Sequence, residues 1–286
     1  MCRFIAYIGN PLVLDEVLFK PNNSLIKQSV NSKENKDPLN GDGFGLGWYA
    51  QDIDFNPAIF RSIQPAWNDL NLQHLASKLR SNCFFAHVRS ASRGHVSQFN
   101  CHPFNYKQYL FMHNGDIGDF DKIVRELRHQ LSDEIYNWIQ GQTDSEHIFA
   151  LFLQYLNDHQ SHINTKETAA ILLKTIYEIK KLKENKNIDS ISKINAVITD
   201  GKSMIAVRYS SDLNVSPETL YYASGSHYEY HDHTCHIKKN ENGKTGTVII
   251  ASEKLTNYNA EWHEIPPNHF FLVFDDLSIL LLPIHE

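Results

Sequence analysis

The chain has 286 residues and a formal net charge of −6, with 42% hydrophobic and 21% charged residues. This composition is ordinary for a globular protein, and without a cluster of Lys and Arg it argues against a surface that binds nucleic acid or an anionic membrane. No apolar run is long enough to cross a bilayer and the N-terminus lacks the pattern of a secretory signal, so we expect a cytoplasmic protein.

Apolar runs of strand length recur along the chain, separated by a few segments with helical spacing. The runs predict strands over 2–9, 44–50, 83–90, 109–113, 195–200, 203–209, 219–223, 247–252, 269–274 and 277–282. Helical spacing predicts helices over 67–80, 119–131, 144–157 and 166–182. Polar composition predicts loops over 28–43 and 183–192, and a hairpin turn over 199–202. Two groups of strands separated by helices favour an α+β layered fold, which we expect to be one domain over 1–286.

The first segment that could carry chemistry is the N-terminus, Met1-Cys2-Arg3. Initiator methionine is readily trimmed before a small residue, which would leave Cys2 with a thiol and an α-amine. An α-amine has a pKa of about 7.7–8.0, so part of it is neutral near pH 7.5 and can act as a general base for the thiol. Taken alone, an apolar residue that begins a strand remains the commoner role for such a cysteine. Four scattered cysteines without a CxxC pair predict neither a disulfide framework nor a cysteine-rich zinc site.

The strand over 83–90 ends in polar residues. Alternation along a strand places His87, Arg89 and Ala91 on one face. An arginine at a strand end is suited to bidentate capture of a carboxylate, although a structural ion pair is the commoner role of a lone arginine.

The strand over 109–113 runs directly into His113-Asn114-Gly115. An asparagine amide and a glycine N–H can point together at a developing oxyanion, and glycine lets the chain pass close to a substrate. A plain turn at the end of a strand is the alternative, since Asn-Gly is a common turn pair.

Two further segments are ambiguous. Asp144, at the start of the helix over 144–157, could bind a substrate ammonium, but Thr143 or Asp144 could equally be a helix cap. Cys101 and His102 are neighbours, so on a strand they would point to opposite faces and form a poor catalytic dyad.

Two segments have the composition of a ligand site, one for phosphate and one for a metal, but neither has the residue spacing that such a site needs. The glycine-rich run over 40–48 contains Asp42, which would repel phosphate, and no Lys-Ser/Thr follows, so we exclude a P-loop. The run over 227–236 is rich in His, but its spacing matches no standard zinc pattern, so we expect a polar hairpin or loop and no metal.

In this order, the motifs resemble the class II glutamine amidotransferases, a branch of the N-terminal-nucleophile hydrolases. The segments that carry the resemblance are Met1–Arg3, Asp42–Gly45, His87–Ser92, Asn100–Phe104, His113–Gly115 and Thr143–Glu146. In the second half of the chain, Ile250–Leu255 and Trp262 resemble the free-standing subfamily, which includes the γ-glutamyl hydrolase of ergothioneine biosynthesis.

The resemblance implies a four-layer α/β/β/α sandwich of two mainly antiparallel sheets. It implies hydrolysis of a γ-glutamyl amide through a thioester on Cys2, with neither a metal nor an organic cofactor. The Asn114 side chain and the Gly115 N–H would form the oxyanion hole. Arg89 would bind the α-carboxylate of the glutamyl group and Asp144 its α-ammonium, with His113 and Ser90 also on the substrate side.

The sequence leaves the leaving group and the partners open. The family's larger enzymes carry a Trp at the position of Ser90, so this site could admit a bulkier γ-substituent than glutamine provides. We expect residues 28–40 and 226–245 to decide the leaving group. The alternatives are an ammonia-donating glutaminase subunit that depends on a synthase partner, and a non-catalytic γ-glutamyl-binding protein. Either a synthase partner or a homo-oligomer fits the resemblance.

Overall fold

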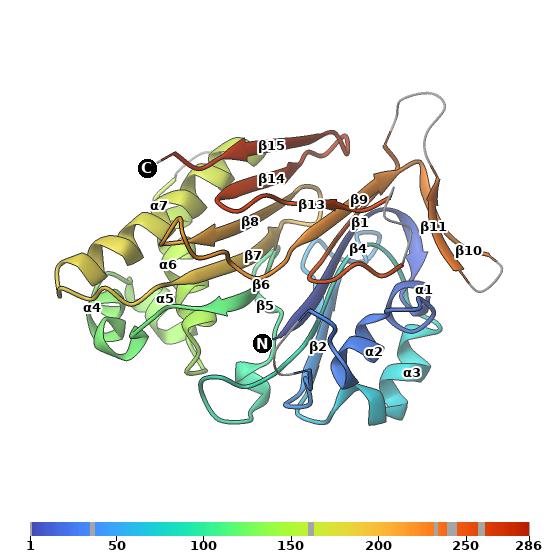
Figure 1. The fold of residues 1–286 in the computed structure, drawn as a ribbon, viewed down its shortest axis with the longest axis horizontal. Helices are drawn as coiled ribbons and strands as arrows, with labels where there is room; N and C mark the ends of the chain where they lie inside the picture. The colour runs from blue at the N-terminus through green and yellow to red at the C-terminus, as the bar shows by residue number, and fades with distance from the viewer. Residues whose placement is uncertain are drawn as a thin grey trace.

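The protein forms two antiparallel sheets that lie face to face, with helices covering both outer faces (Figure 1). The computed structural model describes residues 2–34, 38–159, 163–231, 234–238, 245–256 and 261–285. Within these ranges the layers run helices, sheet, sheet, helices, which confirms the predicted α/β/β/α sandwich of two antiparallel sheets. None of the helices in these ranges is long and apolar enough to cross a membrane.

The first sheet has seven strands, in the spatial order β13-β9-β12-β1-β4-β2-β3. Its strands are β1 (Arg3–Val13), β2 (Phe44–Trp48), β3 (Ala58–Ser62), β4 (Arg80–Val88), β9 (Tyr221–Gly225), β12 (Thr247–Ala251) and β13 (His263–Glu264). Its outer face is covered by α1 (Asp15–Leu18), α2 (Leu25–Val30) and α3 (Leu70–Ala76), with the short 3-10 helix η1 (Ala66–Asn68).

The second sheet has six strands, in the spatial order β15-β14-β8-β7-β6-β5. Its strands are β5 (Phe104–Tyr106), β6 (Tyr109–Asp116), β7 (Lys193–Thr199), β8 (Met204–Ser210), β14 (His269–Val273) and β15 (Ile279–Pro283). Its outer face is covered by α4 (Val124–His129), α5 (Asp133–Trp138), α6 (Asp144–Asn157) and α7 (Thr165–Glu184). The remaining elements are the hairpin β10 (His227–His231) and β11 (Thr234–Lys238), and the 3-10 helices η2 (Gln98–Asn100) and η3 (Phe120–Lys122).

Strand alternation decides which side chains meet between the sheets. On β1, Phe4 lies in the core between the sheets, whereas Ile5 lies in the core under α1–α3. On β6, Met112 lies between the sheets, whereas Phe111 packs under the helices on the other side. Residues of one parity on each strand therefore share the space between the sheets.

The glycine-rich segment is the strand β2, packed closely against the other sheet. A Cβ on Gly45 would lie 2.2 Å from the carbonyl oxygen of His102, and one on Gly47 would lie 2.8 Å from Pro103. Only glycine allows this approach, so these residues serve sheet packing, in keeping with the exclusion of a P-loop.

The long, well-capped helices and strands such as β12 and β14 match their predictions, whereas two short helices, α2 and α3, do not. Helix α6 has the predicted bounds, and its N-cap Thr143 accepts a bond from the Glu146 backbone N–H at 3.2 Å. The loop predicted over 28–43 is wrong at its start, because α2 runs through Val30, with Ser24 as its N-cap. The predicted helix over 67–80 is shorter, since α3 ends at Ala76.

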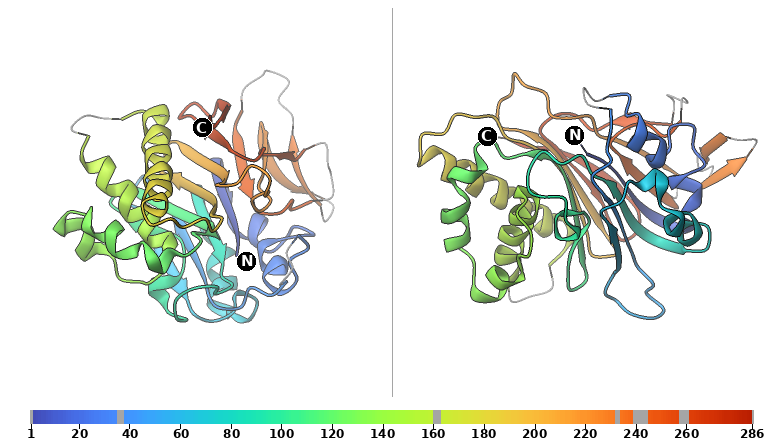
Figure 2. Two further views of the ribbon diagram at one scale, coloured as in Figure 1. Left: turned by 60° about the vertical axis from the view of Figure 1, so that its left-hand side comes forward. Right: turned by 90° about the horizontal axis from the view of Figure 1, so that it is seen from below.

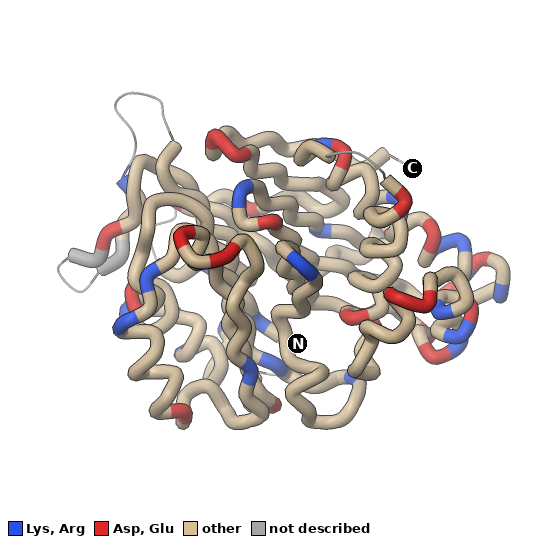
Figure 3. The backbone as a smooth tube through the Cα atoms, turned by 180° about the vertical axis from the view of Figure 1, so that it is seen from behind, with Lys and Arg blue, Asp and Glu red and all other residues tan. Residues whose placement is uncertain are grey.

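The histidine-rich run forms the hairpin β10–β11, as expected for a polar hairpin. Residues 232 and 233, part of that run, lie outside the described residues. Over the described ranges, no group of three His, Cys, Asp or Glu side chains could hold a metal ion. Acidic and basic residues are interspersed over the face shown in Figure 3.

Candidate active site

Cys2 directly precedes β1, a strand that runs through the middle of the molecule between the two helical layers (Figure 2). Its parity on the strand is that of Phe4, which faces the space between the sheets. The Cys2 Sγ lies 3.4 Å from the carbonyl oxygen of Ser90 and 3.4 Å from the Ser90 backbone nitrogen. Burial raises the pKa of the thiol, and the bond from the Ser90 N–H opposes that shift.

Arg89 follows β4 directly and is 3% exposed. Its Nη2 donates to the carbonyl oxygen of Arg93 at 2.9 Å, and its Nη1 donates to that of His95 at 3.3 Å. Two carbonyl groups of the loop after β4 therefore bond the guanidinium, and its other N–H groups are donors that could bind a further acceptor. Asp42 fixes the same loop, because its Oδ2 accepts a bond from the Ala91 backbone N–H at 2.8 Å.

Asn114 lies on β6 with the parity of Met112, so it belongs to the face between the sheets. Its side chain is 2% exposed, and neither the amide oxygen nor the amide nitrogen has a hydrogen-bond partner among the described residues. Buried amides in native proteins are nearly always bonded, so such a group points to a function. Next to it, a Cβ on Gly115 would lie 2.0 Å from the carbonyl oxygen of Lys193, which excludes any residue but glycine.

His113 has the opposite parity and lies on the helical side of β6. It is 1% exposed, its Nδ1 lies 2.8 Å from the Ser145 Oγ, and its Nε2 lies 3.4 Å from the Lys193 carbonyl oxygen. Burial lowers the pKa of the imidazole. The structure therefore places His113 on the far side of β6 from the face that Asn114 shares with the first sheet.

Asp144 is the first residue of α6 and is 5% exposed. Its Oδ2 accepts a bond from the Ile117 backbone N–H and its Oδ1 one from the Ser145 backbone N–H, each at 2.8 Å. It therefore joins the end of β6 to the start of α6. The carboxylate of Asp116 is near enough that, after burial, the charge of Asp144 raises its pKa.

Two histidines that the sequence did not single out as a pair lie in contact between the sheets, with their ring planes tilted by 33°. The rings of His87 and His102 have centroids 4.2 Å apart, and their nitrogens have no partner among the described residues. Burial and the positive charge of Arg89 lower the pKa of His87 to about 3, and burial lowers the pKa of His102 well below its ordinary value. The neighbouring Cys101 donates from its Sγ to the Ser97 carbonyl oxygen at 3.4 Å, so Cys101 and His102 form no dyad.

Sequence reasoning also missed an ion pair beside Cys2. Arg3 and Glu253 are both about 1% exposed at their side chains, and the Arg3 Nε lies 2.8 Å from the Glu253 Oε1. The only hint in the sequence was the segment Ile250–Leu255, which resembles the free-standing subfamily without a physical role attached to it.

The chain matches the family described as class II glutamine amidotransferases over residues 24–282. It belongs to this family. It is 35% identical over 302 residues to a probable glutamine amidotransferase, DUG3, of Saccharomyces cerevisiae, with 99% of this chain and 84% of that protein covered. It is 36% identical over 117 residues to the γ-glutamyl-hercynylcysteine sulfoxide hydrolase of Mycolicibacterium smegmatis, with 40% of this chain and 51% of that protein covered.

Solved structures agree with this class II amidotransferase fold. A glutamine aminotransferase class-II domain protein from Silicibacter pomeroyi superposes with a TM-score of 0.65 at 25% identity, covering 99% of this chain and 100% of that chain. The glutamine phosphoribosylpyrophosphate amidotransferase of B. subtilis superposes with a TM-score of 0.61 at 14% identity over 98% of this chain and 49% of that chain, which shows the fold alone. The family match begins after Cys2, so the role of that residue rests on the site itself.

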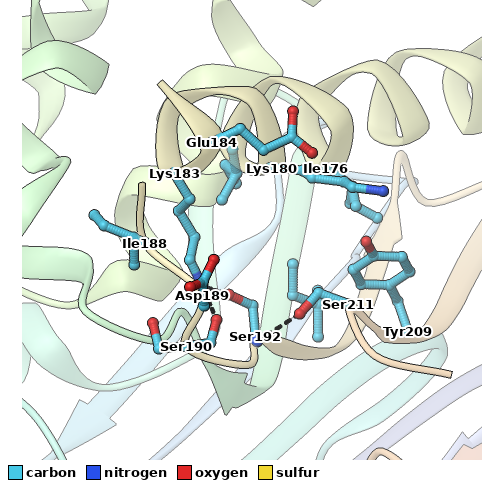
Figure 4. Close-up of a pocket in the computed structure, with 12 residues that line it drawn as sticks. Ile176, Lys180, Lys183, Glu184, Ile188, Asp189, Ser190, Ser192, Tyr209 and Ser211 are labelled. Carbon is cyan, nitrogen blue, oxygen red and sulfur yellow. Dashed lines mark hydrogen bonds between the residues drawn. The ribbon is translucent and has the colours of Figure 1, made fainter. Parts of the chain in front are cut away.

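A cavity of about 190 Å³ lies away from these residues, between α7 and the strands β7 and β8 (Figure 4). Inside it, Lys183 donates from its Nζ to the Ser192 Oγ at 2.9 Å and to the carbonyl oxygen of Ser190. The Ser192 Oγ in turn accepts a bond from the Gly118 backbone N–H at 3.2 Å. These bonds support the segment that follows β6, and the cavity contains none of the predicted site residues.

Proposed function

We propose that this amidotransferase hydrolyses the γ-amide bond of glutamine or of a γ-glutamyl conjugate, with Cys2 as the nucleophile once Met1 is removed. The observation that carries the proposal is the Asn114 amide, which is buried between the sheets and has no hydrogen-bond partner in the part of the chain that the structure describes. An unbonded donor held in a dry site is what an oxyanion hole requires. Membership of the class II family makes a γ-glutamyl amide the natural substrate class.

The glutamyl group would be recognised at its two charged ends. Arg89 uses two N–H groups on the loop carbonyls of Arg93 and His95, which orients its guanidinium, and its remaining donors would bind the α-carboxylate. Asp144 accepts one backbone N–H on each carboxylate oxygen, and its remaining lone pairs would bind the α-ammonium. Both groups are fixed before substrate arrives, which lowers the entropic cost of positioning the amide.

The reaction would proceed through a thioester. The neutral α-amine of Cys2 takes the proton from Sγ, and the sulfur attacks the γ-carbonyl carbon. Negative charge develops on the carbonyl oxygen, where the Asn114 amide N–H and the Gly115 backbone N–H would stabilise it. The tetrahedral intermediate collapses when the α-ammonium of Cys2 protonates the leaving amine. Water then attacks the γ-glutamyl thioester with the amine again as base, releasing glutamate and the thiol.

Ser90 and His113 take different places in this scheme. The Ser90 backbone bonds the Cys2 sulfur, and its side chain is shorter than the Trp that the family's larger enzymes carry at this position. His113 bonds Ser145 at the start of α6, so we assign it to the support of Asp144 rather than to contact with substrate.

The leaving group is tested by comparing substrates. The relatives at 35% and 36% identity are named for a glutamine amidotransferase and for a hydrolase of a γ-glutamyl conjugate. Because Ser90 leaves space, we expect a higher kcat/KM for a γ-glutamyl anilide than for L-glutamine. If glutamine is hydrolysed far better than the anilide, the proposal that the site prefers a bulky leaving group is wrong. If neither substrate releases glutamate unless a synthase subunit is added, the proposal that the protein is active without a partner is wrong.

A further inference from the structure

The carboxylate of Glu253 collects five hydrogen bonds although it lies just beyond β12, far from Cys2 in sequence. Its Oε1 accepts from the Arg3 Nε at 2.8 Å, from the Ser32 Oγ at 2.5 Å and from the Glu34 backbone N–H at 3.1 Å. Its Oε2 accepts from the Asn23 Nδ2 at 3.3 Å and from the Lys33 backbone N–H at 3.2 Å. A carboxylate with this many donors is fixed in place and stays ionised.

Arg3 connects this carboxylate to Cys2. Its Nε is shared between Glu253 and the Ser32 Oγ, each at 2.8 Å, and its Nη1 donates to the carbonyl oxygen of Cys2 at 2.9 Å. Its neighbour Phe4 is held from the same segment, since the Phe4 N–H donates to the Ser252 Oγ at 3.1 Å and its carbonyl accepts from the Ser252 N–H. The segment after β12 therefore hydrogen-bonds to both residues that follow Cys2, namely Arg3 and Phe4.

A nucleophile at the end of a chain needs such support. Terminal residues fray unless they are tied down, and removal of Met1 leaves no chain on one side of Cys2. Strand β1 begins only at Arg3, and the hydrogen bonds of the Cys2 sulfur within the described residues are the two long ones to Ser90, at 3.4 Å each. At 2.9 Å, the bond from the Arg3 Nη1 to the Cys2 carbonyl oxygen is shorter than either contact with Ser90, and Glu253 holds that guanidinium on the outer side of the sheet.

We infer that Arg3 and Glu253 are positioning residues that hold the Cys2 backbone in register for attack, and that Glu253 couples this register to the loop around Ser32–Glu34. This inference rests on the proposed function. Ser32, Lys33 and Glu34 bind the same carboxylate and belong to the region that we expect to decide the leaving group. One anionic group therefore fixes the nucleophile and that loop relative to each other.

The test is the substitution Glu253→Gln, with Glu264→Gln as the matched control. Glu264 pairs with the buried Arg208 at 2.6 Å and lies on the edge strand β13, which β9 and β12 separate from β1. Each processed protein, verified by intact mass, is titrated with 6-diazo-5-oxo-norleucine to give the maximal labelling rate and the half-saturating concentration. Near-UV circular dichroism gives the folded fraction, so that rates refer to folded chains.

We expect Glu253→Gln to lower the maximal labelling rate at least about tenfold, because small misplacements of a reacting group cost about this much or more. The half-saturating concentration should stay within about twofold, since Arg89 and Asp144 are untouched and recognition is separate from attack. Glu264→Gln should leave both values unchanged. An unchanged maximal rate per folded chain for Glu253→Gln would overturn the inference and show that the ion pair serves folding alone.

If Glu253→Gln does not fold, the milder substitution Ser32→Ala, which keeps the ion pair, tests whether this network positions Cys2. It should lower the maximal labelling rate several-fold and leave the half-saturating concentration unchanged, whereas no change in rate would overturn the inference. Failure of the wild-type protein to label would instead contradict the proposed function, so the two failures are distinguishable.

Discussion

The sulfur of Cys2 is 3.4 Å from both the backbone nitrogen and the carbonyl oxygen of Ser90. A thiol can donate to the carbonyl, and a thiolate can accept from the N–H, so one residue serves both protonation states. Burial raises the pKa of the thiol, so the resting form is protonated and reaction needs a base beside it. The α-amine on the same residue would be that base.

Replacing Cys2 by Ala should abolish hydrolysis and leave the fold intact. Among the described residues the sulfur makes two long hydrogen bonds, both to Ser90, so we expect little change in the thermal midpoint. The matched control is Cys83→Ala, which removes a fully buried sulfur from the core between the sheets. That variant should lose stability and keep turnover. Glutamate release and thermal unfolding of both proteins check the prediction, and turnover by Cys2→Ala would refute the nucleophile.

Replacing Asn114 by Leu should separate activity from stability. Loss of an oxyanion donor lowers kcat by about 10²–10³-fold. The free energy of unfolding should rise by about 1 kcal/mol, because a buried amide without partners is costly and Leu has a similar shape. Steady-state kinetics and denaturant unfolding measure the two effects. A kcat within about tenfold of wild type, or a clear loss of stability, would contradict the role of the amide.

Replacing Arg89 by Lys should weaken substrate binding more than turnover. Lysine cannot hold the carbonyls of both Arg93 and His95 and still bind a carboxylate through two parallel bonds. We expect KM to rise by about 10–100-fold, which corresponds to about 1.4–2.8 kcal/mol. Arg61→Lys is the control, since the Arg61 guanidinium donates to the Pro103 carbonyl oxygen at 2.9 Å. An equal rise of KM in both variants would mean that loss of an arginine disturbs the structure around the site, and would contradict a specific role of Arg89 in binding the carboxylate.

The buried pair His87 and His102 should make the protein sensitive to acid. Burial lowers both pKa values in the folded state, that of His87 to about 3. The unfolded chain therefore takes up protons below pH about 6.5 while the folded chain does not, and stability falls as pH drops below that value. Each histidine contributes up to about 1.4 kcal/mol per pH unit in this window.

His102→Phe should reduce that sensitivity, because phenylalanine keeps an aromatic ring at this position without a titrating group. Denaturant unfolding of wild type and variant at about pH 7.5 and about pH 5.5 gives the comparison. The variant should lose less stability between the two values than the wild type. An equal loss in both proteins would assign the acid sensitivity to other groups.

The elements that sequence predicted well are those specified locally. Thr143 caps α6 and apolar spacing continues to Asn157, so both bounds are readable from neighbouring residues. Alternation along β4 placed Arg89 on the face of Phe85, which lies between the sheets. The strand β5 has only three residues, too few to show a period.

The elements that escaped prediction depend on residues far apart in the chain. Arg3 and Glu253 are 250 positions apart, and nothing local marks either as part of an ion pair. His87 and His102 come from a strand and a loop that only the packed sheets bring together. The parity of β6 would have separated His113 from Asn114, but the resemblance placed them together on the substrate side.

The central claim is that Cys2, freed of Met1, is a nucleophile in a site that binds a glutamyl group. Intact mass after incubation with 6-diazo-5-oxo-norleucine tests it most directly, with peptide mapping to locate the label. The account predicts a chain without Met1 that carries one adduct, on Cys2, and no adduct in Cys2→Ala. A chain that lacks Met1 and refuses the label, or carries it on Cys83 or Cys101, would contradict the account.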